Sequence, residues 1–238
     1  MDVRHALTML GMCAAVTLPG CREATSADHT LDAKLQPLDI AVCAPSQGGF
    51  SATVTNPYFP IRAGSQWVYE GTESGALIHL EITAPNQRET VAGVSTRVVE
   101  ERESSDGVVT EISRNFFAQA RDGTVCYFGE AVDIYEGGQI VSHEGSWRAD
   151  QAGNAPGIMM PSTPQKGQTF KVESAPGVAE DEATIVGTGT AHVTAGTFTQ
   201  TIKTREYNPL DGGRGTKVYA SGTGLIVDGS VDLISYTP

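Results

Sequence analysis

The sequence has few residues of the kinds that form recognisable catalytic motifs. Only four cysteines and five histidines occur among 238 residues, and none stands in a Cys-x-x-Cys or His-Glu-x-x-His spacing. A phosphate-binding Gly-x-x-x-x-Gly-Lys-Ser/Thr loop and a Gly-x-Ser-x-Gly elbow are also missing, and Ser162 precedes Lys166 by one residue too many for a Ser-x-x-Lys pair. Thiol redox chemistry, phosphate-loop chemistry and motif-based nucleophilic hydrolysis therefore find no support.

Basic residues are scarce as well. Sixteen Lys and Arg stand against 28 Asp and Glu, a formal net charge of −12. So acidic a chain repels phosphate backbones and anionic headgroups, which argues against nucleic-acid binding and against direct membrane binding. Beyond the first 20 residues no apolar run approaches the ~20 residues that a membrane-spanning helix needs.

The N-terminal sequence has the pattern expected of an export signal. Arg4 precedes an uncharged stretch over residues 6–18, which ends in Leu18-Pro19-Gly20-Cys21. This layout resembles a bacterial lipoprotein signal, in which the cysteine receives lipid and becomes the new N-terminus. The alternatives are an ordinary secretory signal cut near Ala27 and a short buried helix. The sequence thus predicts a signal peptide (residues 1–20), a flexible tether (21–50) and one domain (51–238), exported to the periplasm or outer surface and anchored at Cys21.

The mature chain keeps two further cysteines, Cys43 and Cys126. An even pair in an oxidising compartment is a disulfide candidate. Two unrelated buried thiols are the alternative.

Hydrophobic periodicity in the remaining sequence is two, not 3.6. In Ala76–Thr83, for example, Ile78, Leu80 and Ile82 share one face. Gly-containing turns separate many such segments, which is typical of β-hairpins. The expected strands cover residues 66–71, 76–83, 94–102, 108–117, 124–135, 139–147, 169–173, 183–193, 196–207, 216–220, 224–228 and 231–236. They indicate an all-β antiparallel meander, closed as a barrel or forming a strongly curved half-barrel, with one long irregular loop over about 148–168.

Several phrases of the chain together resemble those of exported bacterial lipoproteins that have no assigned function. They are Asn56-Pro57-Tyr58-Phe59-Pro60, Gly64-Ser65-Gln66-Trp67-Val68-Tyr69, Tyr127-Phe128-Gly129-Glu130, Gly157-Ile158-Met159-Met160-Pro161 and Tyr219-Ala220-Ser221-Gly222-Thr223-Gly224-Leu225. The resemblance covers about residue 56 to the C-terminus. It implies a half-barrel like that of the periplasmic lipoprotein carriers, which hold an apolar ligand in a curved sheet. It carries no catalytic residues, and Cys126 departs from the large residue expected there.

Candidate ligand-binding residues come from the acidic, aromatic and methionine positions near the long loop. Gly129 suggests a bulge that re-aims its neighbours. We expect one cavity bordered by Trp147, Glu130, Asp181, Tyr127, Met159 and Glu173, since aromatic and methionine side chains adapt to irregular apolar ligands. The alternatives are solvated carboxylates paired with arginine, a hard-cation site such as Ca²⁺, and a Trp147 that only fills the core.

Three classes of function remain open from the sequence. The first is a monomeric, non-enzymatic domain that binds a small organic or lipid-like ligand without metal or other cofactor. The second is a barrel-type enzyme using Glu130 and Asp181 as acid or base beside Trp147. The third is a structural envelope protein whose sheet contacts another protein. The isolated histidines fit solvated or cross-strand-paired positions better than metal ligation.

Overall fold

The computed structural model describes residues 36–238. The predicted signal peptide, the lipidation site Cys21 and the first part of the tether lie outside the described residues. Within residues 36–238 there is no α-helix, and so none long and apolar enough to cross a membrane.

The described chain is built almost entirely of β-strands, preceded by two short 3₁₀ helices, η1 (Ile40–Cys43) and η2 (Pro45–Gln47). This confirms the predicted all-β class. The strands are β1 (Gln66–Glu73), β2 (Ala76–Thr83), β3 (Arg88–Val91), β4 (Val94–Ser105), β5 (Val108–Gln119), β6 (Val125–Glu136), β7 (Gln139–Ser142), β8 (Trp147–Arg148), β9 (Gly157–Met160), β10 (Thr169–Lys171), β11 (Glu182–Val193), β12 (Gly196–Tyr207), β13 (Arg214–Ala220), β14 (Gly224–Asp228) and β15 (Val231–Thr237).

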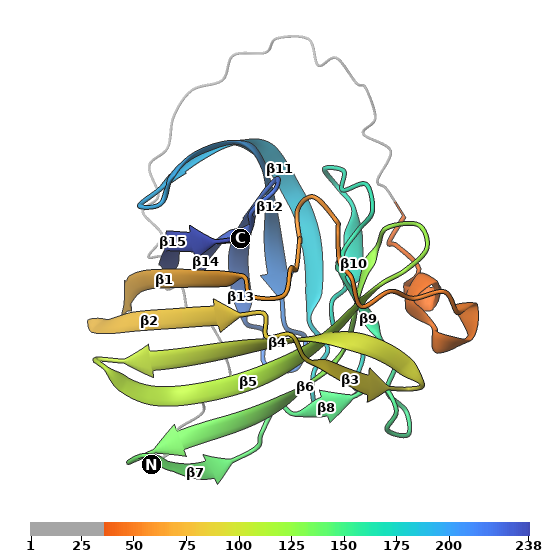
Figure 1. The fold of residues 1–238 in the computed structure, drawn as a ribbon, viewed down its shortest axis with the longest axis horizontal. Helices are drawn as coiled ribbons and strands as arrows, with labels where there is room; N and C mark the ends of the chain where they lie inside the picture. The colour runs from red at the N-terminus through yellow and green to blue at the C-terminus, as the bar shows by residue number, and fades with distance from the viewer. Residues whose placement is uncertain (1–35) are drawn as a thin grey trace, which may run out of the picture.

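All fifteen strands belong to one antiparallel sheet. Its main path runs β10-β11-β12-β13-β14-β15-β1-β2-β4-β5-β6-β7, while β3 pairs with β4, and β8 and β9 pair with β6. The sheet curls strongly, so that β11 and β12 run steeply across the direction of β1, β2 and β5 (Figure 1). The two ends approach at a single bridge between Ala155 and Ser174. The sheet is not closed into a continuous ladder, which makes it a curved half-barrel.

Two local features differ from the expected strands. Residues 88–91 form the additional strand β3, and the strand expected over residues 139–147 is broken into β7 and β8. The break follows from side chains that replace ladder bonds: Ser146 Oγ accepts a hydrogen bond from Val132 N at 2.8 Å, and His143 Nδ1 lies 2.9 Å from Val132 O.

The connection over residues 148–168 is irregular except for β9, which pairs with β6. Gly157 begins β9. A Cβ atom there would lie 2.0 Å from Val172 O, so the missing side chain allows the backbones to approach closely. The connection thereby brings Met159 and the segment that follows β10 toward β6.

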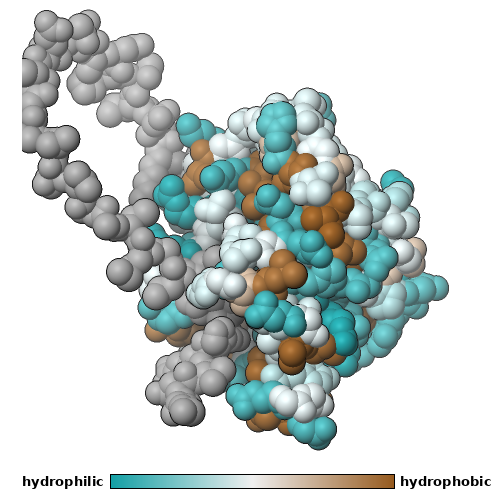
Figure 2. Space-filling model, turned by 90° about the vertical axis from the view of Figure 1, so that its left-hand side faces the viewer, coloured by the Kyte–Doolittle hydropathy of each residue, from teal (hydrophilic) through white to brown (hydrophobic). Residues whose placement is uncertain are grey.

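The outer face around the hairpin ends carries scattered apolar side chains. Leu77 is the second residue of β2, Val108 is the first of β5, and Ile140 and Val141 lie in β7, each about half exposed. On the face seen in Figure 2, hydrophobic groups alternate with hydrophilic ones. Isolated exposed apolar residues of this kind are normal on protein surfaces.

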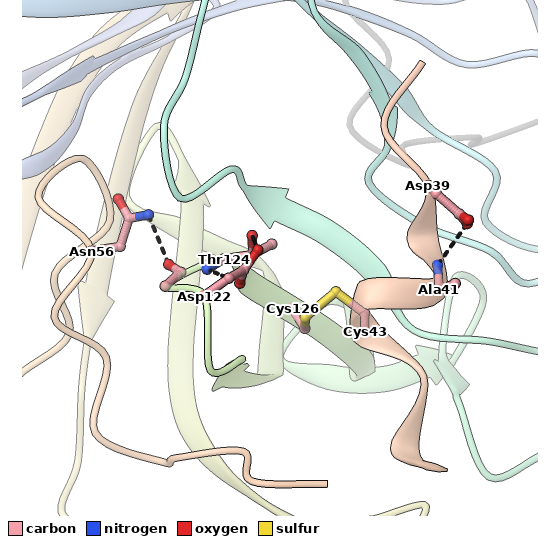
Figure 3. Close-up of a disulfide and its surroundings, with 8 residues drawn as sticks. Asp39, Ala41, Cys43, Asn56, Asp122, Thr124 and Cys126 are labelled. Carbon is pink, nitrogen blue, oxygen red and sulfur yellow. Dashed lines mark hydrogen bonds between the residues drawn. A yellow bond between two sulfur atoms is a disulfide. The ribbon is translucent and has the colours of Figure 1, made fainter. Parts of the chain in front are cut away.

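Cys43 and Cys126 form a disulfide, with their Cα atoms 5.5 Å apart. The bond joins η1 to β6 (Figure 3), and both residues are fully buried. Regular structure therefore begins before residue 51, within the segment 21–50 that the sequence assigned to a flexible tether. Leu38 N donates a hydrogen bond to Thr169 O of β10 at 2.8 Å, so residues 38–50 lie against the sheet.

The segment that leads into β1 is fixed by Asn56. Its Nδ2 donates to Pro161 O at 2.9 Å and to Gly123 O at 3.2 Å. Phe59 then places its ring 5.1 Å from the ring of Phe117. The two prolines around this segment, Pro57 and Pro60, limit its backbone freedom, and the Phe59 ring covers part of the inner face of the sheet.

Candidate functional site

The curled sheet forms a partly open cavity of about 250 Å³. Residues from both ends of the sheet line it, from β1, β2, β4, β5 and β6 on one wall and from β12, β13 and β14 on the other. The turn over residues 172–181 supplies further lining side chains. The cavity is therefore a product of the curvature, with no single strand or loop sufficient to form it.

Strand register explains why particular residues face the cavity. Cross-strand partners project from the same face of a sheet. One such row crosses five strands through Trp67, Ile82, Glu101, Ser113 and Val132, and all five line the cavity. A neighbouring row contains Val99, Asn115 and Glu130, and these also line it.

Aromatic rings form much of the apolar wall. Phe117 and Tyr127 stack with their centroids 4.8 Å apart, and Phe59 lies 6.3 Å from Tyr219. Tyr69 is fully buried, and its hydroxyl donates to Leu225 O at 2.9 Å. Because these rings are held by stacking and hydrogen bonds, this wall presents a preformed surface.

A bulge in β6 directs both Tyr127 and Glu130 into the cavity. Between the partners of Asn115 and Phe117 the register of β6 slips by one residue. Gly129 occupies the bulge with φ of 132°, and a Cβ atom there would lie 2.4 Å from Trp147 O. The sequence suggested this bulge, and the structure confirms it. Side chains that strict alternation would send to opposite faces therefore point the same way.

Carboxyl groups dominate the polar part of the cavity. Within residues 36–238, eight acidic side chains and one basic side chain line it. The acidic residues are Glu101, Glu111, Glu130, Glu144, Glu173, Asp181, Glu206 and Asp228, and the basic residue is Lys217. The cavity therefore carries a large excess of potential negative charge.

Lys217 is paired with two of these carboxylates. Its Nζ lies 3.6 Å from Glu206 Oε2 and 3.5 Å from Asp228 Oδ2. Burial opposes the charged ammonium, yet Asp228 and Glu206 hold the pKa of Lys217 well above its ordinary value. One lysine thus remains charged between two acids, and this part of the cavity is internally compensated.

Carboxyls contributed by β4 and β5 have raised pKa values. Burial, with Asp228 and Glu103 nearby, raises the pKa of Glu101 to about 7 despite the opposing field of Lys217. Burial and repulsion from Glu103 and Glu101 likewise raise the pKa of Glu111 to about 7. These groups exchange protons near neutral pH, where ordinary carboxyls are ionised.

The pair Glu130 and Glu173 shows the largest perturbations among these acids. Burial raises the pKa of Glu173 to about 8, with repulsion from Asp181 as the next cause. Burial and the nearby Glu173 carboxyl raise the pKa of Glu130 well above its usual range. Burial also raises the pKa of Asp181. At neutral pH the cavity therefore holds protons that a ligand could displace or share.

A chain of hydrogen bonds extends from this acidic group along β5 and β6. The Tyr127 hydroxyl donates to Asn115 Oδ1, and Asn115 Nδ2 lies 3.2 Å from Ser113 Oγ. Tyr127 also interacts with the Glu130 carboxyl. This interaction lowers the pKa of Glu130, against the larger effects of burial and of the nearby Glu173 carboxyl.

Five of the six predicted ligand-binding residues line the cavity: Glu130, Asp181, Tyr127, Met159 and Glu173. The sixth, Trp147, is opposite Glu130 in the β6–β8 ladder, but it is only 1% exposed and does not line the cavity. Its ring packs edge-on against Tyr127 at 5.3 Å. Trp147 thus supports the cavity wall from behind.

The cavity contains further polar residues that the sequence did not single out: Glu101, Glu111, Ser113, Asn115, Glu206, Lys217 and Asp228. The available signal was weak. Glu111, Ser113 and Asn115 alternate with Ile112, Arg114 and Phe116, and alternation alone does not say which face is inside.

The arginine and histidine contacts described here involve groups that do not line the cavity. Arg114 contacts Glu100 and Asp133, and Arg148 contacts Glu89 and Asp150. Buried Arg97 donates to backbone oxygens of Ala52 and Pro85 and to Asn86. His79, His143 and His192 contact Glu70, Asp133 and Thr197 respectively. A group of three or more side chains placed to hold a metal ion does not occur in the described residues.

The raised pKa values predict a stability that decreases as pH rises. A carboxyl whose pKa is higher in the folded state binds more protons there than in the unfolded chain, so stability falls between about pH 4.5 and 8. We expect the free energy of unfolding to be lower by about 2 kcal/mol or more at pH 8.5 than at pH 5.5. Urea denaturation at both values measures it.

Two single variants identify the source of this pH dependence. Glu130→Gln should make it less steep, because one of the buried groups no longer ionises. Glu136→Gln should leave it unchanged, because Glu136 is exposed at the end of β6. A stability that rises between pH 5.5 and 8.5 would contradict the assignment.

No family model matches the sequence, and neither the curated proteins nor the solved structures contain a match. The function is therefore argued from the cavity.

Proposed function

We propose that this protein is an exported, lipid-anchored β domain that binds a small organic or lipid-like ligand inside the curved sheet. The observation that carries the proposal is the cavity of about 250 Å³. Ligand sites are concave, largely preformed and lined by apolar rings with a few polar groups. Phe59, Trp67, Phe117, Tyr127 and the carboxyls fit that description.

The lining argues against a cavity that merely reflects incomplete packing. A hollow left by poor packing would be apolar, since burying a carboxyl without compensation costs several kcal/mol. Here several acids face the hollow and are partly exposed to it. Retaining them in the wall is consistent with a polar group of a ligand being bound there.

Export is supported by the disulfide between Cys43 and Cys126, because such bonds persist in oxidising compartments. The lipid anchor rests on the Leu18–Cys21 sequence. We expect the full chain expressed in a lipoprotein-processing bacterium to partition into detergent and to incorporate a fatty-acid analogue. Cys21→Ala should abolish both, and Cys43→Ala should retain labelling. Equal labelling of wild type and Cys21→Ala would refute the anchor.

The enzyme alternative draws on one observation, the raised pKa of Glu130 beside Tyr127. A carboxyl that keeps its proton near neutral pH can act as a general acid. Binding requires no such step, and a bound small molecule recovered unchanged after prolonged incubation would favour binding over catalysis.

The binding function is testable with a neutral apolar fluorophore, N-phenyl-1-naphthylamine. We expect a saturable, one-to-one fluorescence increase with the folded mature domain. Ser113→Phe fills the cavity from β5 and should abolish the increase, while Ser235→Phe makes the same change at an exposed position of β15 and should not. Absence of binding, or equal binding by both folded variants, would overturn the proposal. Native mass spectrometry of protein purified from its host would then reveal a co-purified ligand.

A further inference from the structure

The charge distribution in the cavity indicates which ligand chemistry it accepts. Lys217 is already engaged by Glu206 and Asp228. The six other lining acids, Glu101, Glu111, Glu130, Glu144, Glu173 and Asp181, make no ion pair with a basic side chain in residues 36–238. The positive charge that would complement them is therefore not supplied by this part of the chain.

A second observation points to the same part of the cavity. The indole Nε1 of Trp147 is buried and makes no hydrogen bond of ordinary geometry. It is directed toward the Glu173 carboxyl, whose pKa it helps to lower against the larger effect of burial. An orphaned buried donor of this kind is rare. The acceptor at hand is the Glu173 carboxyl, which also lines the cavity.

The aromatic part of the lining also suits a cation. Ammonium groups are attracted to the faces of aromatic rings, and Trp67, Phe117 and Tyr127 line the same cavity as the carboxyls. A hydrocarbon body attached to the cation would occupy the remaining space beside Ile82, Val99 and Met159.

We propose that the cavity binds an organic cation, an amine or quaternary ammonium group on an apolar body, with Glu130 and Glu173 as its principal counter-ions. This inference rests on the proposed binding function and names the ligand class. An organic anion would find only one basic side chain in the lining, Lys217, which Glu206 and Asp228 already pair. A divalent metal needs several oxygen ligands at 2.3–2.6 Å, and the described residues contain no group of side chains placed to provide them.

Binding of a cation must be linked to protonation. A positive charge favours the ionised carboxyls, so binding releases protons and strengthens as pH rises from 6 to 9. The titratable and charged groups that line the same cavity as Glu130 and Glu173 are Tyr69, Glu101, Glu111, Tyr127, Glu144, Asp181, Glu206, Lys217, Tyr219 and Asp228. Lys217 carries the one opposing charge among them.

Three probes of similar size test the charge preference: benzyltrimethylammonium (cation), benzyl alcohol (neutral) and phenylacetate (anion). We expect the cation to bind at least tenfold more tightly than the other two at pH 8.5, by saturation-transfer NMR titration. Its affinity should fall at least fivefold at pH 5.5, whereas that of benzyl alcohol should not change. Calcium chloride at 1 mM should not displace it.

Variants that remove the charge of single carboxyls test which of them act as counter-ions of the bound cation. Glu130→Gln and Glu173→Gln should each weaken the cation at least fivefold and leave benzyl alcohol unaffected, while Glu136→Gln and Glu182→Gln, at exposed positions, should change neither. If N-phenyl-1-naphthylamine binds but the wild type shows no preference among the three probes, or calcium displaces the cation, the inference fails and the binding function stands. If none of the four organic probes binds, both fail.

Discussion

Replacing Lys217 by methionine is expected to lower the free energy of unfolding by about 3–5 kcal/mol at pH 8. Methionine keeps most of the stem but removes the ammonium that lies 3.6 Å from Glu206 and 3.5 Å from Asp228. Two carboxylates then face each other in a partly buried site without a counter-charge. At pH 5 the loss should be smaller, because burial already raises the pKa of Glu206 and a protonated acid needs no counter-ion. Urea denaturation at both pH values measures the difference.

The neighbouring strand provides a matched control. Lys203 of β12 is exposed, and Lys203→Met should change stability by less than about 0.5 kcal/mol at either pH. Adding Glu206→Gln and Asp228→Asn to Lys217→Met should recover much of the loss at pH 8. Equal losses at pH 5 and pH 8 would contradict a role for Lys217 as the counter-ion of Glu206 and Asp228.

Removing the disulfide is expected to cost about 4 kcal/mol. The bond joins residues 83 positions apart, and cross-linking so long a loop strongly limits the unfolded chain. A Cys43→Ala, Cys126→Ala double variant should show this loss in urea denaturation, and wild-type protein unfolded under reducing conditions should show a comparable one. Thiol counting on denatured, unreduced mature protein should find neither cysteine reactive.

The two single variants separate the cross-link from local packing. Cys43→Ala and Cys126→Ala each lose the bond, and combining them should add little. Additive losses in the double variant would mean that the side chains matter through packing on either side of the sheet, with the covalent bond contributing little.

The fold was predictable because its signals are local. Alternation in Ala76–Thr83 and glycine-containing turns such as Asp106-Gly107 specify strands and hairpins without reference to the rest of the chain. The break between β7 and β8 was not predictable. It depends on Ser146 and His143 reaching Val132 on another strand, and that contact exists only once the sheet has formed.

The candidate site was predictable only where the signal that forms it is local in the sequence. The Gly129 bulge is visible in the sequence and brings Tyr127 and Glu130 to one face. Glu101 and Lys217, in contrast, lie on opposite walls, and only the curvature of the whole sheet gives them a common cavity. Trp147 was placed near Glu130 but assigned to the lining, and its position behind Tyr127 follows from packing that alternation does not encode.

The link between Cys43 and Cys126 also has a mechanical consequence. Residues 44–125, which include β1 to β5, lie inside a covalent loop. A pulling force applied between the two ends of the chain passes through the sulfur atoms and bypasses these residues. About 290 Å of contour length, at ~3.5 Å per residue, cannot be drawn out while the bond is intact. Tension on the N-terminal segment therefore reaches β6 directly and leaves the wall containing Glu101 and Glu111 unloaded.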